Sequence, residues 1–208
     1  MTPDPLNALG GERLVPVVVI DDAGAAPDLA SALAAGGIRC AEITLRTPAA
    51  VAAIEAASGV ADFVVGAGTV TEPDQVDLVV DAGARFVVCP GLDEAVIERA
   101  ARLGVPVIPG VATATEIQRA MRLGLRALKL FPAHLMGGPA AIRAFAGPFP
   151  DVRFLPSGGV SADNAREYLA SPTVFAVSGS WMVPETALRT RDFGAVRDLS
   201  AAAVAALG

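Results

Sequence analysis

Lys129 is the first candidate for chemistry in this sequence, because it is the only lysine among 16 basic residues. A lysine amine that burial and a neighbouring cation keep neutral can attack a ketone and form a Schiff base. Arg46 is a candidate for that cation. Arginine cannot replace the amine, because a guanidinium group stays protonated. A buried Lys129 equally fits a structural ion pair with Glu42, so both interpretations stay open.

A predicted strand at residues 38–45 positions the acidic candidate. Glu42, Thr44 and Arg46 alternate there with apolar residues. Successive side chains of a strand point to opposite faces, and the apolar ones would face the surrounding helices. We therefore expect the three polar side chains to line the interior near the carboxyl end of the strand.

A second predicted strand, at residues 126–131, carries the lysine. Its two leucines would face the helices, which leaves Ala127, Lys129 and Phe131 on the inner face. The sequence thus directs Lys129 and Glu42 toward a common interior.

Short apolar runs alternate with alanine-rich amphipathic stretches along the chain, which predicts alternating strands and helices. The predicted strands span residues 14–20, 38–45, 62–65, 85–89, 105–109, 126–131, 152–156 and 173–177. The predicted helices include residues 28–35, 49–57, 73–82, 93–103, 115–123 and 162–169, and several stop at a glycine that can adopt the left-handed cap.

Eight such units predict an α/β fold, a single (β/α)8 TIM barrel over residues 1–208. Residues 1–12 form a leader segment in this interpretation, and residues 192–207 a last helix. The alternative is an open doubly wound sheet. Such a sheet usually carries a glycine-rich dinucleotide turn, and the glycines at 66–68 lack its third member.

Composition argues against several other chemistries. One histidine and two distant cysteines are too few for the usual zinc site, and the lysine stands outside any phosphate-loop motif. A net charge of −6 argues against nucleic-acid and anionic-membrane partners. The polar, proline-containing start and the lack of a long apolar run predict neither a signal peptide nor a membrane span. We therefore expect a soluble, cytoplasmic protein with reduced cysteines and no metal site.

Six short motifs occur in a fixed order near the predicted strand ends. They are EITLRT at 42–47, GAGT at 66–69, CPG at 89–91, KLFPA at 129–133, PSGGV at 156–160 and GSW at 179–181. Each motif is weak alone, but six in order are specific. The chain resembles the 2-keto-3-deoxy-6-phosphogluconate (KDPG) aldolases and the related 4-hydroxy-2-oxoglutarate (KHG) aldolases from Val15 to Pro184.

The resemblance implies a class I aldolase that needs no metal or organic cofactor and acts on a small keto acid or sugar-acid phosphate. Lys129 would form the Schiff base, and Glu42 would act as general acid and base, through water in the cleavage step. The resemblance also implies a homotrimer.

Four further residues acquire roles in substrate binding from the same resemblance. Arg46 would hold the substrate carboxylate as a guanidinium fork pairs with an anion. Thr69 would add a hydroxyl hydrogen bond at that end. Phe131 would form a wall of the pyruvyl pocket, and Pro90 would lie at its rim.

Two glycine- and serine-containing loops are candidates for a phosphate site. Ser157, Gly158 and Gly159 follow the seventh predicted strand and open a predicted helix, and Ser180 follows the eighth strand. In many (β/α)8 barrels these loops bind phosphate through backbone N–H groups. Each loop alone fits a tight turn equally well, but both together, opposite Arg46, predict a phosphate site.

Several alternatives remain open from the sequence. The substrate could belong to the gluconate or the galactonate series, or be 4-hydroxy-2-oxoglutarate. A phosphate-binding isomerase or epimerase could use Glu42 and Lys129 without a covalent step, and a non-catalytic sugar-phosphate binding protein is a third hypothesis. His134 follows the lysine strand where relatives often carry an acidic residue; we interpret it as a loop histidine, with contact to the leaving aldehyde as the alternative.

Overall fold

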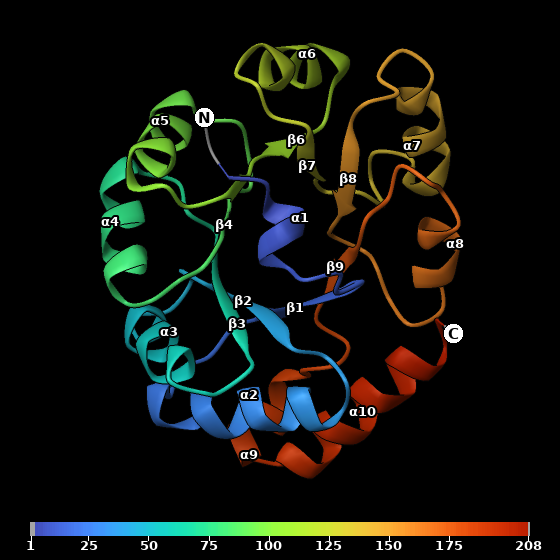
Figure 1. Cartoon of the computed structure of the whole chain (residues 1–208). Helices are drawn as coiled ribbons and strands as arrows, with labels where there is room; N and C mark the ends of the chain where they lie inside the picture. The colour runs from blue at the N-terminus through green and yellow to red at the C-terminus, as the bar shows by residue number, and fades with distance from the viewer. Residues whose placement is uncertain (1–2, 208) are drawn as a thin grey trace.

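Strands and helices alternate along the chain in the computed structural model, which describes residues 3–207 (Figure 1). The strands are β1 (Leu14–Val18), β2 (Cys40–Thr44), β3 (Val64–Gly68), β4 (Val87–Val88), β5 (Val107–Ile108), β6 (Gly110–Val111), β7 (Ala127–Leu130), β8 (Arg153–Pro156) and β9 (Val177–Gly179). All pairings between these strands are parallel.

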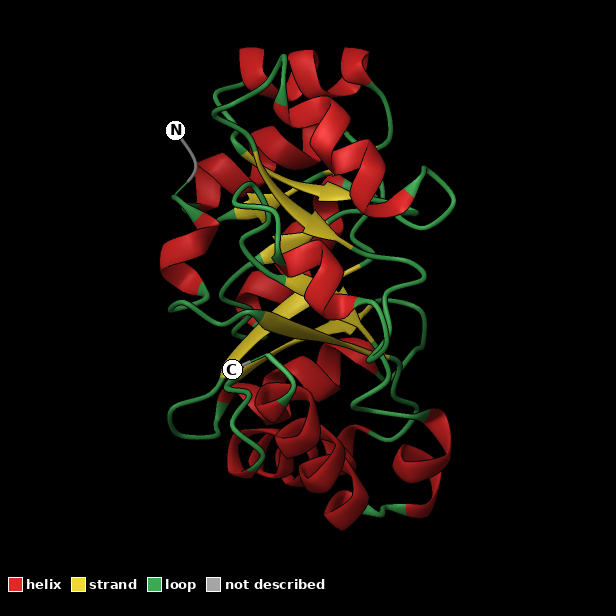
Figure 2. Cartoon of the chain, turned by 90° about the vertical axis from the view of Figure 1, so that its right-hand side faces the viewer, coloured by secondary structure: helices red, strands yellow, loops and turns green. Residues whose placement is uncertain are grey.

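The helices surround the strands, which run through the middle of the molecule in Figure 2. They are α1 (Pro5–Ala8), η1 (Ala23–Ala25), α2 (Ala26–Ala35), α3 (Ala50–Ser58), α4 (Pro73–Asp81), α5 (Glu94–Leu103), α6 (Ala114–Arg122), α7 (Gly138–Ala146), α8 (Ala165–Leu169), α9 (Glu185–Thr190) and α10 (Phe193–Ala205). The expected glycine stops are present: Gly104 and Gly124, for example, follow α5 and α6 with φ of +68° and +82°. No helix between residues 3 and 207 has both the length and the apolar character needed to cross a bilayer.

The expectation of a closed eight-stranded barrel is wrong. The strands form a curled six-stranded sheet, in the order β5-β4-β3-β2-β1-β9, which makes half of a barrel, and a separate three-stranded sheet in the order β6-β7-β8. Pro109 separates β5 from β6, and because proline has no N–H group it cannot continue the hydrogen-bond ladder. At the other junction, within the described residues 3–207, only the isolated bridges Phe154↔Val174 and Ser157↔Ser178 join the sheets.

The two sheets nevertheless enclose one interior. A small inner core contains residues from strands of both sheets, namely Leu9, Val15, Cys40, Phe86, Val88, Ile108, Leu155 and Ala176. A larger core, with Ile43, Leu128 and Leu130, lies between the strands and the helices. Apolar side chains on both faces of a strand are what a helix-covered parallel sheet requires.

The segment predicted as a leader contains α1, which lies over the centre of the strands in Figure 1. Leu9, directly after α1, belongs to the inner core beside Val15. Leu9 is 2% exposed and so covers the amino end of the interior.

Two strands have a boundary more than two residues away from the predicted one. The strand predicted at 62–65 instead spans Val64–Gly68. A methyl group at Gly66 would overlap the Phe86 ring, so glycine here serves packing rather than a turn. The strand predicted at 173–177 instead lies at Val177–Gly179, and the preceding residues form only an isolated bridge.

Candidate active site

Glu42 and Lys129 form a buried ion pair in the common interior. Glu42 comes from β2 and Lys129 from β7, and they are 0% and 5% exposed. Lys129 Nζ donates a hydrogen bond to Glu42 Oε1 at 3.2 Å. Among residues 3–207, Glu42 Oε2 has no hydrogen-bond partner although it is buried. An amine therefore lies against a carboxylate that keeps one acceptor oxygen available.

Strand β3 leaves the space that the Glu42 carboxylate occupies. The register places Gly66 opposite Glu42 and Gly68 opposite Thr44. A methyl group at Gly68 would lie 3.1 Å from Glu42 Oε1, which is tighter than ordinary van der Waals contact. Thr44 is itself fixed, because its hydroxyl donates to the Val18 carbonyl oxygen at 2.9 Å. Thr44 and Gly68 therefore support the position of Glu42, a role that the sequence alone did not reveal.

Phe131 connects the ion pair with the glycine loop. Lys129 Nζ lies 5.2 Å from the centre of the Phe131 ring, within the range of a cation–π contact. The same ring approaches Gly158, where a methyl group would lie 3.2 Å from two ring carbons. Phe131 therefore stands between the amine and the loop after β8, as a wall of the site would.

Thr69 follows β3 directly and has an unusual backbone conformation. Its φ of +60° lies in the left-handed region, which a β-branched residue seldom adopts. Such strain tends to occur at functional sites, where the surrounding structure enforces it. This observation supports Thr69 as a site residue independently of the sequence motif.

Pro90 lies beside the lysine strand through Gly110, a residue that sequence reasoning missed. Gly110 pairs with Lys129 in the register of β6 and β7. A methyl group at Gly110 would overlap the Pro90 carbonyl oxygen and lie 2.7 Å from the Gly91 nitrogen. Glycine at position 110 thus lets the Pro90 loop approach the strand pair that carries the amine. The Pro109-Gly110 dipeptide was the available signal.

The two predicted phosphate loops meet. Ser157 and Ser178 form a parallel bridge, and a methyl group at Gly179 would lie 3.2 Å from the Val160 carbonyl oxygen. Gly158 and Gly159 both have left-handed φ values, +87° and +80°.

Their backbone N–H groups are available for a ligand. Within residues 3–207, the N–H groups of residues 158–160 and 180–182 donate no hydrogen bond. Successive free N–H groups around left-handed residues form anion-binding sites. One expectation is corrected: α8 begins only at Ala165, so these glycines lie in a loop and do not open the helix directly.

Arg46 is not brought into contact with the ion pair. Strand β2 ends at Thr44, and Arg46 lies in the following turn, exposed at the carboxyl edge of the strands. The backbone N–H of Arg46 donates to the Thr44 carbonyl oxygen at 2.8 Å. Strand alternation therefore does not determine where its side chain points.

Cys89, in the CPG motif, is buried. It belongs to the core between strands and helices, and its burial raises the pKa of the thiol to about 12, although the charge of Lys129 opposes this shift. Such a thiol stays protonated and unreactive. Cys89 is therefore a small apolar core residue.

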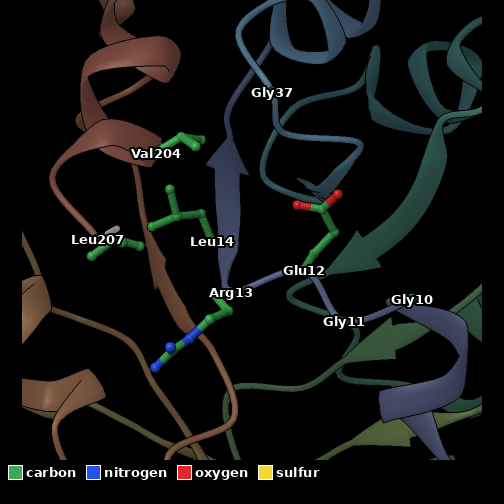
Figure 3. Close-up of a pocket in the computed structure, with 8 residues that line it drawn as sticks. All are labelled: Gly10, Gly11, Glu12, Arg13, Leu14, Gly37, Val204 and Leu207. Atoms are coloured by element: carbon green, nitrogen blue, oxygen red, sulfur yellow. The ribbon is translucent and has the colours of Figure 1, made fainter.

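A pocket at the opposite, amino end of the strands is separate from these residues (Figure 3). Its lining includes Glu12, Arg13 and Leu14, the first residue of β1, whereas Glu42 pairs with Val17 further along that strand. Burial is the main cause that raises the pKa of the Glu12 carboxyl above its ordinary value. None of the predicted site residues lines this pocket.

Comparisons with known proteins agree with the motif pattern. The sequence profile of the family described as KDPG and KHG aldolase matches residues 7–199. The 2-dehydro-3-deoxy-phosphogluconate aldolase of Dickeya dadantii (strain 3937) is 47% identical over 193 residues, which are 92% of this chain and 91% of that protein. The KHG/KDPG aldolase of Escherichia coli (strain K12) is 45% identical over 192 residues, 92% of this chain and 90% of that protein.

A solved structure shares the fold. KDPG aldolase from Legionella pneumophila, with pyruvate captured at low pH as a covalent carbinolamine intermediate, aligns with a TM-score of 0.92 and 39% identity. The alignment covers 97% of this chain and 98% of that one.

Proposed function

The chain belongs to the KDPG and KHG aldolase family. From this premise we propose that it cleaves 2-keto-3-deoxy-6-phosphogluconate reversibly to pyruvate and glyceraldehyde 3-phosphate. The reaction would proceed through a Schiff base on Lys129. The family's members are aldolases, which are carbon–carbon lyases acting on small molecules. The observation that carries the proposed mechanism is the buried contact of 3.2 Å between Lys129 Nζ and Glu42 Oε1.

Formation of the imine begins with a proton transfer across that contact. Lys129 passes a proton to Glu42, and the neutral amine attacks the C2 keto carbon of the substrate. A proton moves from nitrogen to oxygen in the adduct to give the carbinolamine. Glu42 returns its proton to the departing hydroxyl, water leaves, and the protonated imine remains.

Cleavage uses the imine as an electron sink. Glu42, through a water molecule, takes the proton of the C4 hydroxyl, the C3–C4 bond breaks, and its electron pair moves toward the imine nitrogen. The aldehyde leaves, and an enamine of pyruvate stays on Lys129. Protonation of the enamine at C3 and hydrolysis of the resulting imine release pyruvate and restore the lysine. A capture of pyruvate as a carbinolamine in the Legionella pneumophila relative supports this sequence of steps.

Residues around the Lys129 amine bind the pyruvyl end of the substrate. Arg46, exposed at the carboxyl edge, pairs with the substrate carboxylate, and the hydroxyl of Thr69 adds a hydrogen bond there. Phe131 packs along the keto-acid carbons from one side, and the Pro90 loop limits the pocket at its rim. The contact of Phe131 with both Lys129 and Gly158 supports this arrangement.

The loops at residues 157–160 and 180–182 bind the phosphate end of the substrate. The free N–H groups of residues 158–160 and 180–182 support a dianion without a metal or a lysine. Ser157, Gly158 and Gly159 come from one loop, and Ser180 comes from the other. A substrate with a carboxylate at one end and a phosphate at the other fits a site with two separate anion-binding regions.

A second reaction, cleavage of 4-hydroxy-2-oxoglutarate to pyruvate and glyoxylate, is supported by the Escherichia coli relative named KHG/KDPG aldolase. The imine chemistry is the same, and only the leaving aldehyde differs. Comparing kcat/KM for the gluconate- and galactonate-series phosphates and for hydroxyoxoglutarate assigns the preferred substrate. Cytoplasmic location, a homotrimeric assembly and the organisation of residues 1–208 as one domain stay predictions.

Trapping with borohydride tests the mechanism. Pyruvate plus borohydride should leave a stable adduct with the mass of reduced pyruvate on Lys129, the only side-chain amine in the sequence. Lys129→Arg should give no adduct and no cleavage, whereas an isomerase using Lys129 as a non-covalent acid would retain part of its activity in that variant. A folded wild-type protein that stays unmodified would refute the Schiff-base mechanism.

A further inference from the structure

His134 lies against the phosphate loops although the proposed mechanism gives it no role. A methyl group at Gly159 would overlap the His134 Cβ atom and lie 3.1 Å from its Cγ atom. The absence of a side chain at Gly159 therefore makes room for the His134 side chain directly beside the glycine loop.

Two backbone hydrogen bonds fix this position. The Ala133 N–H donates to the Ser157 carbonyl oxygen at 2.7 Å, and the His134 N–H donates to the Gly158 carbonyl oxygen at 3.0 Å. The segment after the lysine strand is thus held against the segment that carries the free N–H groups. Because both bonds are to backbone atoms, the placement of His134 does not depend on the conformation of any mobile side chain.

The chemistry of the ring suits an anion at this place. His134 is exposed, and its side chain makes no hydrogen bond within residues 3–207. An imidazole carries at least one N–H donor in either protonation state, whereas an ionised carboxylate at the same position would offer none. None of the ion pairs within residues 3–207 involves a residue of these two loops.

We propose that His134 is a specificity-determining residue that donates a ring N–H to the substrate phosphate and favours the phosphorylated aldehyde over its unphosphorylated counterpart. This inference rests on the proposed function, because it assumes that the loops at 157–160 and 180–182 bind the phosphate. It assigns to His134 the discrimination between substrates and leaves the imine chemistry to Lys129.

The test is a ratio of two specificity constants. For wild type, His134→Ala, His134→Gln and His134→Glu, kcat/KM is measured with the phosphorylated sugar acid and with the same sugar acid without its phosphate. Leu135→Ala is the matched control, because Leu135 is the next residue and is 81% exposed. Inhibition by inorganic phosphate is measured in parallel.

One hydrogen bond to a charged group accounts for a loss of about tenfold or more. The phosphorylated-to-unphosphorylated ratio should fall about tenfold in both His134→Ala and His134→Glu, because neither side chain supplies an N–H donor. In His134→Gln, which keeps an N–H donor, the ratio should stay within about threefold of the wild type. Inorganic phosphate should inhibit the alanine and glutamate variants correspondingly more weakly, and Leu135→Ala should match the wild type.

An unchanged ratio in His134→Ala would overturn the proposal, and so would equal losses with both substrates, which indicate only structural support of the loop. Borohydride trapping with pyruvate separates the two levels of inference. Trapping that succeeds in wild type and variants while the ratio does not change refutes the role of His134 alone. Trapping that fails throughout refutes the proposed function itself.

Discussion

Removing one member of the buried ion pair should destabilise the protein far more than removing one member of an exposed pair of the same length. The Lys129–Glu42 pair is 3.2 Å long, with side-chain exposures of 6% and 1%. The Arg102–Glu98 pair on α5 is 3.3 Å long, with exposures of 66% and 64%. Distance is therefore nearly constant between the two pairs, and burial is the variable.

The magnitude follows from the environment of each pair. At an effective dielectric constant of about 20, two unit charges 3.2 Å apart attract by about 5 kcal/mol. In Lys129→Met the Glu42 carboxylate loses its only hydrogen-bond partner among residues 3–207 and stays buried. We expect a loss of about 3–5 kcal/mol in the free energy of unfolding. Arg102→Met should lose less than about 0.5 kcal/mol, because water screens that pair.

Guanidinium denaturation at neutral pH measures both variants, together with the double variant Lys129→Met/Glu42→Leu. The double variant replaces the pair by apolar side chains of similar size, and it should regain most of the loss or exceed the wild type, although it is inactive. A Lys129→Met variant within about 1 kcal/mol of the wild type would refute the reasoning. A double variant no more stable than Lys129→Met would refute it as well, since the cost would then not come from an uncompensated carboxylate.

Three further predictions concern the surroundings of the site and the far pocket. Gly110→Ala should lower the free energy of unfolding by about 1–3 kcal/mol and lower kcat/KM, because the added methyl group overlaps the Pro90 carbonyl oxygen. In the control Gly91→Ala the added methyl group meets no atom within 4 Å, so the free energy of unfolding should change by less than about 0.5 kcal/mol. Equal effects of the two substitutions in denaturation would contradict the packing argument. With a thiol pKa of about 12, roughly one in ten thousand Cys89 side chains is ionised at about pH 8. A thiol reagent should therefore modify Cys89 only after the protein unfolds. Rapid modification of Cys89 in the folded protein would count against its burial. Burial raises the pKa of Glu12, so folding favours the protonated form of its carboxyl group. The stability of the wild type relative to Glu12→Gln should therefore fall as the pH rises through and above the ordinary carboxyl pKa of 4.5. Melting curves that show the opposite trend would disprove this.

Local pattern was sufficient for several parts of the fold. The positions of α2 to α6 and of α10 followed from amphipathic spacing, whereas α7 and α9 were not predicted. The stops at Gly104 and Gly124 followed from the left-handed conformation that glycine adopts without strain. Strand alternation was sufficient to direct Glu42 and Lys129 inward, because apolar neighbours on both strands must face the helices. Arg46 shows the limit of that rule, since β2 ends two residues before it.

The sequence alone could not show which glycines are required for packing near the site. Gly66, Gly68 and Gly110 look alike as letters, yet Gly66 makes room for an aromatic ring, Gly68 for the Glu42 carboxylate and Gly110 for the Pro90 loop. Each reason depends on an element distant in sequence. The way the two sheets pack around the common interior determines these contacts, and local propensity does not.

The sequence by itself determined the family resemblance and the alternation of strands and helices, because short motifs and the apolar periodicity are local properties of the chain. Only the tertiary structure decided that the strands form a half-barrel and a separate three-stranded sheet, because pairing between strands depends on how segments far apart in sequence come together. The tertiary structure also decided the 3.2 Å contact between Lys129 and Glu42 and the position of His134 against Gly159. Residues far apart in sequence meet only when strand register and loop packing bring their backbones together.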